Sequence, residues 1–332
     1  MKFDVTDNPG KAWEAFAEKH ADTPFGSFRW SKVVKEGLKG EPLWFILKNG
    51  TEIVGGMAGV LLKHGGIRLL YCSIPYGGYL GDKRHFGLFM DAFCAETGFA
   101  DIIYLSPYDS DPSLGYAGMF TAHPETVTRI DLRGKDLQEV QSCYAPSVRQ
   151  SLNKGVRLGL RVECRRDRSS FVVAHRLYLE TMRRNNAIAR YPQRWFAAIC
   201  DHLAIIGEAC VYLVFSGDMP ISATVVVDSP KTKHLLHSGA STEHLSLRAN
   251  DLVVCEIIRE AFRGGAETVD FMFSDPKDLP LIGWKEKFGG QSFEVNKYRK
   301  INSPLKHALW QGAKKVAPLF GRVGVRSGST RL

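Results

Sequence analysis

The sequence lacks several features that mark secreted, metal-binding and membrane-spanning proteins. Its seven cysteines are scattered through 332 residues without a Cys-x-x-Cys pair, which argues against a disulfide framework and against a structural zinc site. No segment approaches the ~18 uninterrupted apolar residues that a membrane-spanning helix needs. The first residues, MKFDVTDNPG, carry charges where a signal peptide has its apolar region. We therefore expect a cytoplasmic protein without a metal site.

Acidic residues are absent from the end of the chain and scarce in one internal segment. Residues 303–332 hold six Lys and Arg and no Asp or Glu, and residues 148–168 hold seven basic residues against two acidic ones. The net charge is +9, so the rest of the chain is slightly acidic. This concentration favours a polyanionic partner, such as a phosphate group, a nucleic acid or an anionic lipid. A solvated helix face followed by a disordered tail would explain the same pattern.

The order of the predicted secondary structure elements repeats along the chain. Alternating strand pairs turn at Asn49-Gly50 and at Ser216-Gly217. In both places a helical stretch precedes the pair, and a strand, a loop, a helix and another strand follow it. Gly50 and Gly217 are 167 positions apart, and Ser106 and Ser274 are 168 apart. With 44% apolar and 24% charged residues, the chain is long enough for about two domains. We therefore predict an α/β protein built from two similar units.

This element order resembles the GNAT acyltransferase fold, and two copies in one chain resemble the Fem-type (FemAB/FemX-like) aminoacyltransferases of cell-wall synthesis. The resemblance extends from about Phe28 to Lys300, and four segments carry it. They are CSIPYGGYLGD, APSVRQSLNKGVRLGLRVE, LYLETMRRNNAIARYPQRWF and GWKEKFGG. The first departs from the family, because Gly77-Gly78 replaces a Gly-Pro. In the last, Trp284 takes the aromatic position of a Phe-Lys-x-x-Phe-Gly pattern.

The resemblance implies two tandem GNAT-like domains, each a mixed, mostly antiparallel sheet flanked by helices. The first would span residues 1–145, and the second, on the acyl-donor side, residues 146–302. Residues 303–332 would form a basic tail. Within it, Leu305 to Ala317 have the spacing of an amphipathic helix, which would pack back on the first domain before a disordered end. Membrane-surface binding by this helix is the alternative.

The resemblance also implies roles for individual residues. Lys285 would steady a donor phosphate or the oxyanion of acyl transfer, and Lys287 would face solvent. Arg149 would bind phosphates of the acceptor, because a guanidinium can hold a diphosphate with two hydrogen bonds; a salt bridge at the domain junction is its alternative. We expect four aromatic residues to contribute to substrate binding. They are Trp30, Tyr191, Trp284 and Phe288.

Acyl transfer to an amine needs aligned substrates, an oxyanion donor and a proton acceptor, but no protein nucleophile. Candidate acceptors are Asp270, Asp275, His237 and Tyr191. Asp270 could equally be a polar residue on an exposed strand face. His234 and His237 are three positions apart on a predicted strand, so we expect them on opposite faces and not as a metal pair.

The acyl donor stays open between aminoacyl-tRNA and acyl-coenzyme A, and no tightly bound cofactor is expected. GNAT domains hold the coenzyme A pyrophosphate on a glycine-rich turn at a helix start, but the second repeat reads HLSLRAND there. This argues against coenzyme A. Against tRNA, no heptad stretch corresponds to the coiled-coil arm that some tRNA-dependent relatives carry.

The favoured function is a transferase that moves an acyl or aminoacyl group to an amine of a phosphorylated cell-envelope precursor, either a peptidoglycan peptide or an amino sugar. tRNA and the membrane surface are further candidate partners. One alternative is a tandem-GNAT binding protein without catalysis, which would recognise a phosphorylated lipid or RNA. The other is a coenzyme A-dependent N-acetyltransferase.

Overall fold

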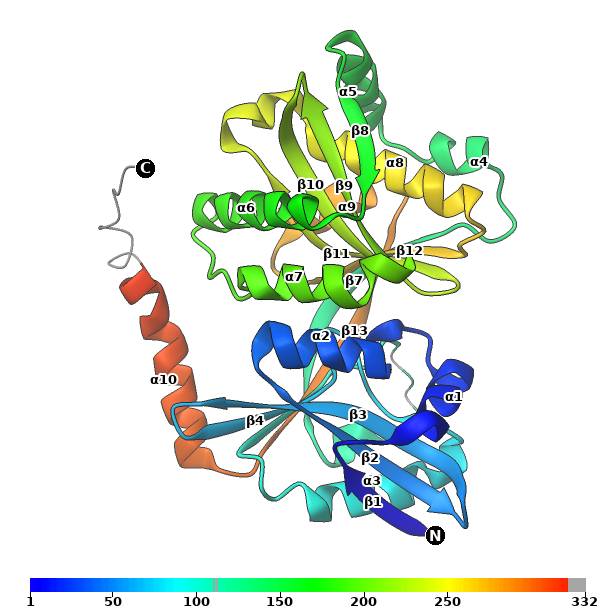
Figure 1. Cartoon of the computed structure of the whole chain (residues 1–332), viewed down its shortest axis with the longest axis vertical. Helices are drawn as coiled ribbons and strands as arrows, with labels where there is room; N and C mark the ends of the chain where they lie inside the picture. Colours follow the sequence, from blue (N-terminus) through cyan, green and yellow to red (C-terminus); the bar gives the residue numbers. More distant parts are fainter. Residues whose placement is uncertain (110, 112, 322–332) are drawn as a thin grey trace.

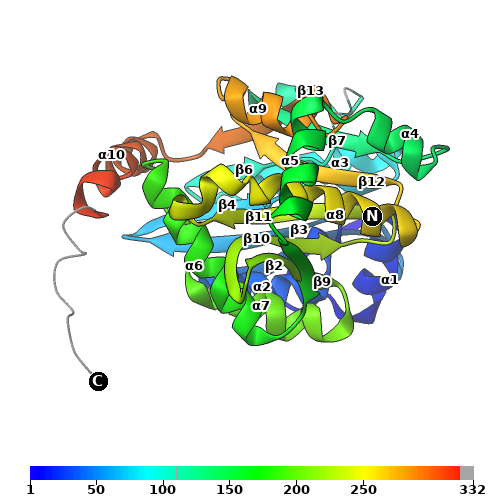
Figure 2. The same cartoon turned by 90° about the horizontal axis from the view of Figure 1, so that it is seen from above.

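The computed structural model describes residues 1–109, 111 and 113–321, and these residues form a single twisted sheet with helices on both faces (Figures 1 and 2). In the first half of the chain the strands are β1 (Lys2–Thr6), β2 (Glu41–Asn49), β3 (Glu52–His64), β4 (Ile67–Cys72), β5 (Leu80–Gly81), β6 (Ile102–Leu105) and β7 (Thr121–Asp131). The helices there are α1 (Gly10–His20), α2 (Phe28–Leu38), α3 (Phe86–Glu96) and α4 (Leu137–Ser142).

The second half repeats this plan. Its strands are β8 (Arg161–Arg165), β9 (Ala209–Ser216), β10 (Met219–Asp228), β11 (Thr232–Ala240), β12 (Thr268–Ser274) and β13 (Gln291–Ile301). Its helices are α5 (Pro146–Arg157), α6 (Arg168–Arg184), α7 (Gln193–His202), α8 (Ala249–Arg263), α9 (Leu279–Glu286) and α10 (Pro304–Gly321). Short 3₁₀ turns at Pro24–Gly26, Lys83–His85, Tyr116–Gly118, Ala204–Ile206 and Thr242–Leu247 connect them.

The predicted repeat is present in the fold. The hairpins β2–β3 and β9–β10 occupy equivalent places, and Gly50 and Gly217 have positive φ values of 61° and 58° at their turns. Each hairpin continues into a strand, a crossover helix and a parallel strand. These parallel pairs are β4 with β6 and β11 with β12. The α/β fold with two GNAT-like units is therefore confirmed.

The sheet runs without interruption from one half of the chain to the other. Its strand order is β1-β2-β3-β4-β6-β13-β7-β12-β11-β10-β9-β8, with β5 beside β3. Strand β13, which comes from the second half of the sequence, lies between β6 and β7, while β7 of the first half pairs with β12. Each half of the chain, divided at the predicted boundary at residue 145, thus contributes a strand that lies between strands of the other half.

An apolar core joins the halves on one side of the sheet. Helix α2 of the first half packs on α7 of the second, where Trp30 and Trp195 meet edge to face with ring centroids 5.4 Å apart. A side chain at Gly37 would come within 2.8 Å of the Trp195 ring, so this close approach requires glycine. Figure 1 shows α2 directly beneath α7 at the junction.

Helix α10 leaves the sheet after β13 and lies along the first half of the chain. Lys306 Nζ reaches both carboxylate oxygens of Asp101 at 3.1 Å, and the Trp310 ring stacks on His64 with centroids 5.6 Å apart. The disorder predicted after the helix falls outside the described residues. Within the described part of the chain, no helix has the length and apolar content to cross a membrane.

Candidate functional site

The parallel strands β11 and β12 separate soon after they begin. They pair only from Thr232 to His234 and from Thr268 to Asp270. Both strands are irregular just past this point. In β11, His237 pairs with Val225 of β10 and Leu235 pairs with Val226 of β10, which leaves Leu236 without a partner in this ladder. In β12 the register shifts between Asp270 and Phe273, and Met272 adopts a positive φ of 61°. An opening flanked by two bulges results, a common setting for functional sites.

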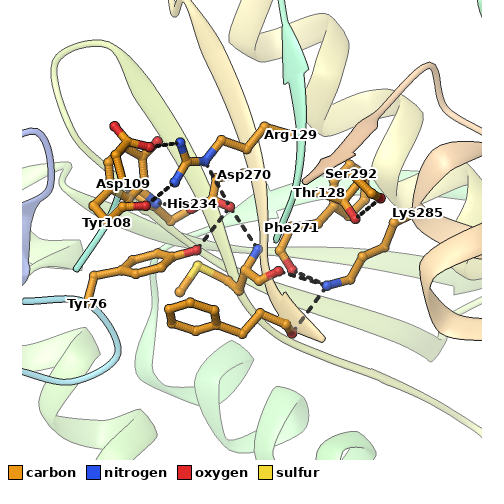
Figure 3. A network of polar contacts seen from close by, with 12 residues as sticks. Tyr76, Tyr108, Asp109, Thr128, Arg129, His234, Asp270, Phe271, Lys285 and Ser292 are labelled. Carbon is orange, nitrogen blue, oxygen red and sulfur yellow. Dashed lines mark hydrogen bonds and ion pairs between the residues drawn. The ribbon is translucent and has the colours of Figure 1, made fainter. Parts of the chain in front are cut away.

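The ammonium group of Lys285 lies against the bulge of β12. Lys285 is 4% exposed and donates to the carbonyl oxygens of Phe271 at 2.7 Å, Met272 at 2.9 Å and Phe273 at 3.3 Å (Figure 3). Three hydrogen bonds occupy all three of its protons. Burial lowers the pKa of Lys285 to about 8, although the charges of Asp270 and Asp278 oppose this shift. In this structure Lys285 therefore fixes the shape of the bulge.

Asp270 lies at the point where β11 and β12 part, and its carboxylate is fully buried. His234 Nδ1 is 3.0 Å from it, the Tyr76 hydroxyl donates at 3.2 Å, and the Met272 N–H donates at 2.9 Å (Figure 3). Burial alone would raise the pKa of Asp270, but the hydrogen bond with His234 and the charges of His234 and Arg129 lower it. The exposed position considered from the sequence is wrong.

The two histidines of β11 lie on the same face of the sheet, so the predicted opposite placement is wrong. Leu236 is an extra residue in β11, so it offsets the alternation of side chains by one position. His234 lies opposite Val227 and His237 opposite Val225, and these two valines are on the same face of β10. The partners of the two histidines differ, because His234 contacts Asp270 and His237 contacts Trp195. No group of three or more His, Cys, Asp or Glu that could hold a metal ion is found among the described residues.

His237 belongs to an aromatic cluster at the α2–α7 junction. Trp195 Nε1 donates to its Nε2 at 2.8 Å, and the Tyr191 ring lies 4.5 Å away between centroids. Burial lowers the pKa of His237 to about 3, with a smaller contribution from His175. Of the predicted aromatic residues, Tyr191 contacts His237 directly, whereas Trp30 contacts Trp195, and this environment is neutral and tightly packed.

A second polar cluster surrounds Asp251 in the first turn of α8. Lys287 Nζ is 2.6 Å from Asp251 Oδ1, Trp284 Nε1 donates to the same oxygen at 3.1 Å, and Ser151 donates to Oδ2 at 2.8 Å. The solvent-facing position predicted for Lys287 is therefore wrong. Phe288 is fully buried against Phe271 and Trp284, so it forms the floor of this cluster.

The remaining predicted residues lie at the surface. Arg149 is exposed on α5 and donates to the carbonyls of Ser142 at 3.1 Å and Tyr144 at 2.9 Å. No salt bridge of Arg149 is found among the described residues, and both of these hydrogen bonds use its Nη2. Asp275 is exposed in the loop after β12, where it accepts the N–H of Lys277.

Two adjoining cavities lie where the halves meet. One has a volume of about 300 Å³ and is lined by residues of the first half, including Gly78 and Tyr116. The other has a volume of about 570 Å³ and takes residues from both halves, including Arg129 and Lys231. Tyr108 and the carboxylates Asp22 and Asp109 line both cavities.

The sequence did not suggest these residues. The Arg129 guanidinium lies 3.6 Å above the centroid of the Tyr108 ring, forms an ion pair with Asp109, and has its Nε 3.9 Å from Asp270 (Figure 3). These partners come from separate strands and loops, so their proximity depends on the strand exchange. The only hint was a charged residue inside the alternating strand TVTRID.

Comparison with known proteins agrees with this geometry. The profile of a family described as an acetyltransferase (GNAT) domain matches residues 145–285. The crystal structure of FemX is similar with a TM-score of 0.72 and 16% identity, over 93% of this chain and 99% of FemX. The chain has the Fem-like tandem GNAT fold. The matched domain supports an acyltransferase.

Two further structures have the same fold at lower similarity. The C-terminal domain of a putative lysylphosphatidylglycerol synthetase from Agrobacterium fabrum has a TM-score of 0.56 and 14% identity, over 87% of this chain and 91% of that one. A tandem GNAT protein from the clavulanic acid biosynthesis pathway has a TM-score of 0.56 and 13% identity, over 91% and 99%. No curated protein matches the sequence.

Proposed function

We propose that this tandem GNAT chain transfers an acyl or aminoacyl group to an amine of a phosphorylated cell-envelope precursor. The observation that carries the proposal is the opening between β11 and β12, flanked by the bulges at Leu236 and Met272, inside the domain that matches the GNAT family. The envelope acceptor rests on the fold similarity to FemX over 93% of this chain.

In the proposed reaction, a neutral amine attacks the activated carbonyl. A C–N bond forms, the C–O or C–S bond to the donor breaks, and the proton lost by the amine ends on the leaving oxygen or sulfur. The negative charge that develops on the carbonyl oxygen needs nearby positive charge or N–H donors in a water-poor site. The buried ammonium of Lys285 supplies positive charge beside the opening, while its three hydrogen bonds hold the bulge of β12 in place.

Aminoacyl-tRNA is the donor that the second half suits better. A coenzyme A pyrophosphate bound at the start of α8 would meet the carboxylate of Asp251, which is buried in the first turn of that helix. This carboxylate already accepts hydrogen bonds from Trp284 and Lys287 at the end of α9. Because Asp251 already lies at this helix start, where the pyrophosphate of coenzyme A would bind, acyl-coenzyme A is the less suitable donor.

The two adjoining cavities are the proposed acceptor site. Asp22 and Asp109 line both, and burial together with the nearby charge of Asp109 raises the pKa of Asp22. Carboxylates in this position suit an amine that arrives protonated and must lose a proton before attack. Arg149 is the proposed contact for the acceptor phosphates, because this residue is exposed and its two hydrogen bonds to backbone carbonyls both use Nη2.

The test offers the purified protein a nucleotide-linked peptidoglycan peptide together with either a mixture of aminoacyl-tRNAs or acetyl-coenzyme A. Mass spectrometry then detects the mass added to the acceptor. We expect addition with aminoacyl-tRNA and none with acetyl-coenzyme A. Product with acetyl-coenzyme A alone would favour the N-acetyltransferase. Binding of the acceptor or of tRNA without any product would favour the non-catalytic binding protein.

A further inference from the structure

Helix α10 attaches to the body through one narrow side. Lys306 and Trp310, one turn apart, make the contacts with Asp101 and His64. The N–H groups of Asn302 and Ser303 also bind the carbonyl of Asp101, at 3.0 and 3.1 Å, and fix where the helix begins. These interactions are polar or aromatic, and none of them involves the leucines of the helix.

The leucine side of α10 faces away from the protein. Leu305 and Leu309 are also one turn apart, and they are 74% and 60% exposed. Leu305 directly precedes Lys306, and Leu309 directly precedes Trp310. The exposed leucines are therefore rotated about the helix axis by about 100° from the two residues that contact the protein. Surface helices of a globular protein normally turn such a stripe inward.

The segment of the sequence that contains α10 carries charge of one sign. Residues 303–332 contain six Lys and Arg and no acidic residue, and Lys314 and Lys315 belong to α10 itself. Figures 1 and 2 show α10 at the outer edge of the molecule, beyond the sheet. An approaching flat surface could therefore reach the helix without meeting the rest of the protein.

We propose that α10 docks on the surface of an anionic lipid bilayer, with Leu305 and Leu309 entering the headgroup boundary. An exposed apolar stripe with basic residues beside it is the pattern of helices that lie in a membrane interface. Each Lys or Arg near an anionic surface strengthens such binding, and this effect weakens as salt shortens the screening length. The proposal is independent of acyl transfer.

A second copy of the chain fits the leucine stripe less well. Stable protein interfaces bury about 1,200 to 2,000 Å² in total. One stripe on a single helix at the edge of the molecule offers much less area. The uniformly basic charge would also place like charges against one another if two such helices paired side by side.

The experiment measures sedimentation of the full chain with vesicles of phosphatidylcholine, with and without an equal part of phosphatidylglycerol. We expect binding to the anionic vesicles only, and release as salt is raised. The variant L305E/L309E should bind at least ~10-fold more weakly, because two buried leucines are lost and two negative charges are gained. Both residues are highly exposed, so the melting temperature should stay unchanged.

The matched control is I205E/I206E, which adds the same charge at apolar residues that are 73% and 48% exposed elsewhere on the surface. This control should bind vesicles as the unaltered chain does. Equal weakening in both variants, or equal binding of the unaltered chain to both kinds of vesicle, would overturn the proposal. So would a concentration-dependent dimer that L305E/L309E abolishes, since a second copy would then cover the stripe.

Discussion

Lys287 and Asp251 form an ion pair of 2.6 Å that ties the end of α9 to the first turn of α8. The carboxylate is buried and also accepts hydrogen bonds from Trp284 and Ser151. The lysine that the sequence assigned to solvent is therefore part of the structure around the proposed donor site. This pair changes the expected consequences of substitution in GWKEKFGG.

Replacing Lys287 with Ala should destabilise the protein, because the buried carboxylate of Asp251 loses its only charged partner among the described residues. The expected cost is about 2 to 4 kcal/mol, measured by urea unfolding. Lys277→Ala, at an exposed position near α9, should cost little. The double variant Lys287→Met with Asp251→Asn should recover part of the loss. Equal unfolding midpoints for Lys287→Ala and Lys277→Ala would show that the pair contributes nothing.

Lys285→Ala should lower turnover by ~10²-fold or more, with acceptor affinity nearly unchanged, because the charge beside the opening is lost. It should also lower the melting temperature, since three buried carbonyls lose their donor. Steady-state kinetics at a temperature where the variant is folded separates these effects. Full turnover in the folded variant would exclude Lys285 from the reaction.

The same residue gives turnover a pH dependence. With a pKa of about 8, Lys285 loses its charge as the pH rises through 8, so turnover should fall there. Between this pKa and about 10.4 the unfolded chain holds the additional proton, so Lys285 makes stability rise with pH in that window. A loss of turnover above pH 8 without unfolding would therefore point to the ammonium.

His237 should make the protein less stable in acid. Its pKa is about 3 in the folded state and about 6.5 in the unfolded chain, so between these values the unfolded state binds more protons. Stability should fall by roughly 1 kcal/mol per pH unit below about 6.5. His237→Gln, which keeps an acceptor for Trp195, should flatten this dependence. Parallel curves for both proteins in urea unfolding at several pH values would contradict the buried neutral histidine.

Coenzyme A should leave the melting temperature unchanged, because Asp251 occupies the start of α8. A ligand at about 100 times its dissociation constant would stabilise the folded state by about 2.7 kcal/mol, which a thermal shift detects easily. Asp251→Asn removes the negative charge and serves as the comparison. A clear stabilisation of the unaltered chain by coenzyme A would reverse the preference for aminoacyl-tRNA.

The sequence was informative where the evidence is local and periodic. The hairpin turns at Gly50 and Gly217 and the equal spacing of the repeats predicted the tandem fold, because alternation and turn chemistry act over a few residues. Side-chain partners were harder to predict. One inserted residue at Leu236 reverses the face of His237, and alternation cannot reveal such a bulge. Tyr76 and Asp270 meet across 194 positions, through a strand exchange that no local pattern encodes.

The same limit applies to Lys285, in the last turn of α9, and Lys287, directly after that helix. Lys285 and Lys287 are two positions apart, so they leave the helix on different sides. The sequence cannot tell which side meets β12 and which meets α8. The resemblance to the Fem-type family singled out Lys285, and the structure buries it, but its catalytic role stays a prediction.

Arg149 offers a test of the acceptor site that is independent of the donor. Arg149→Ala should raise the KM for the phosphorylated acceptor, with a smaller effect on kcat, because a phosphate remote from the reacting carbonyl contributes mainly uniform binding. Its hydrogen bonds to the carbonyls of Ser142 and Tyr144 hold the guanidinium in place, so Arg149→Lys should not restore affinity in full. Arg157→Ala, exposed on the same helix, is the matched control and should leave KM unchanged. An equal rise in KM for Arg149→Ala and Arg157→Ala would mean that α5 attracts the acceptor only through its general positive charge.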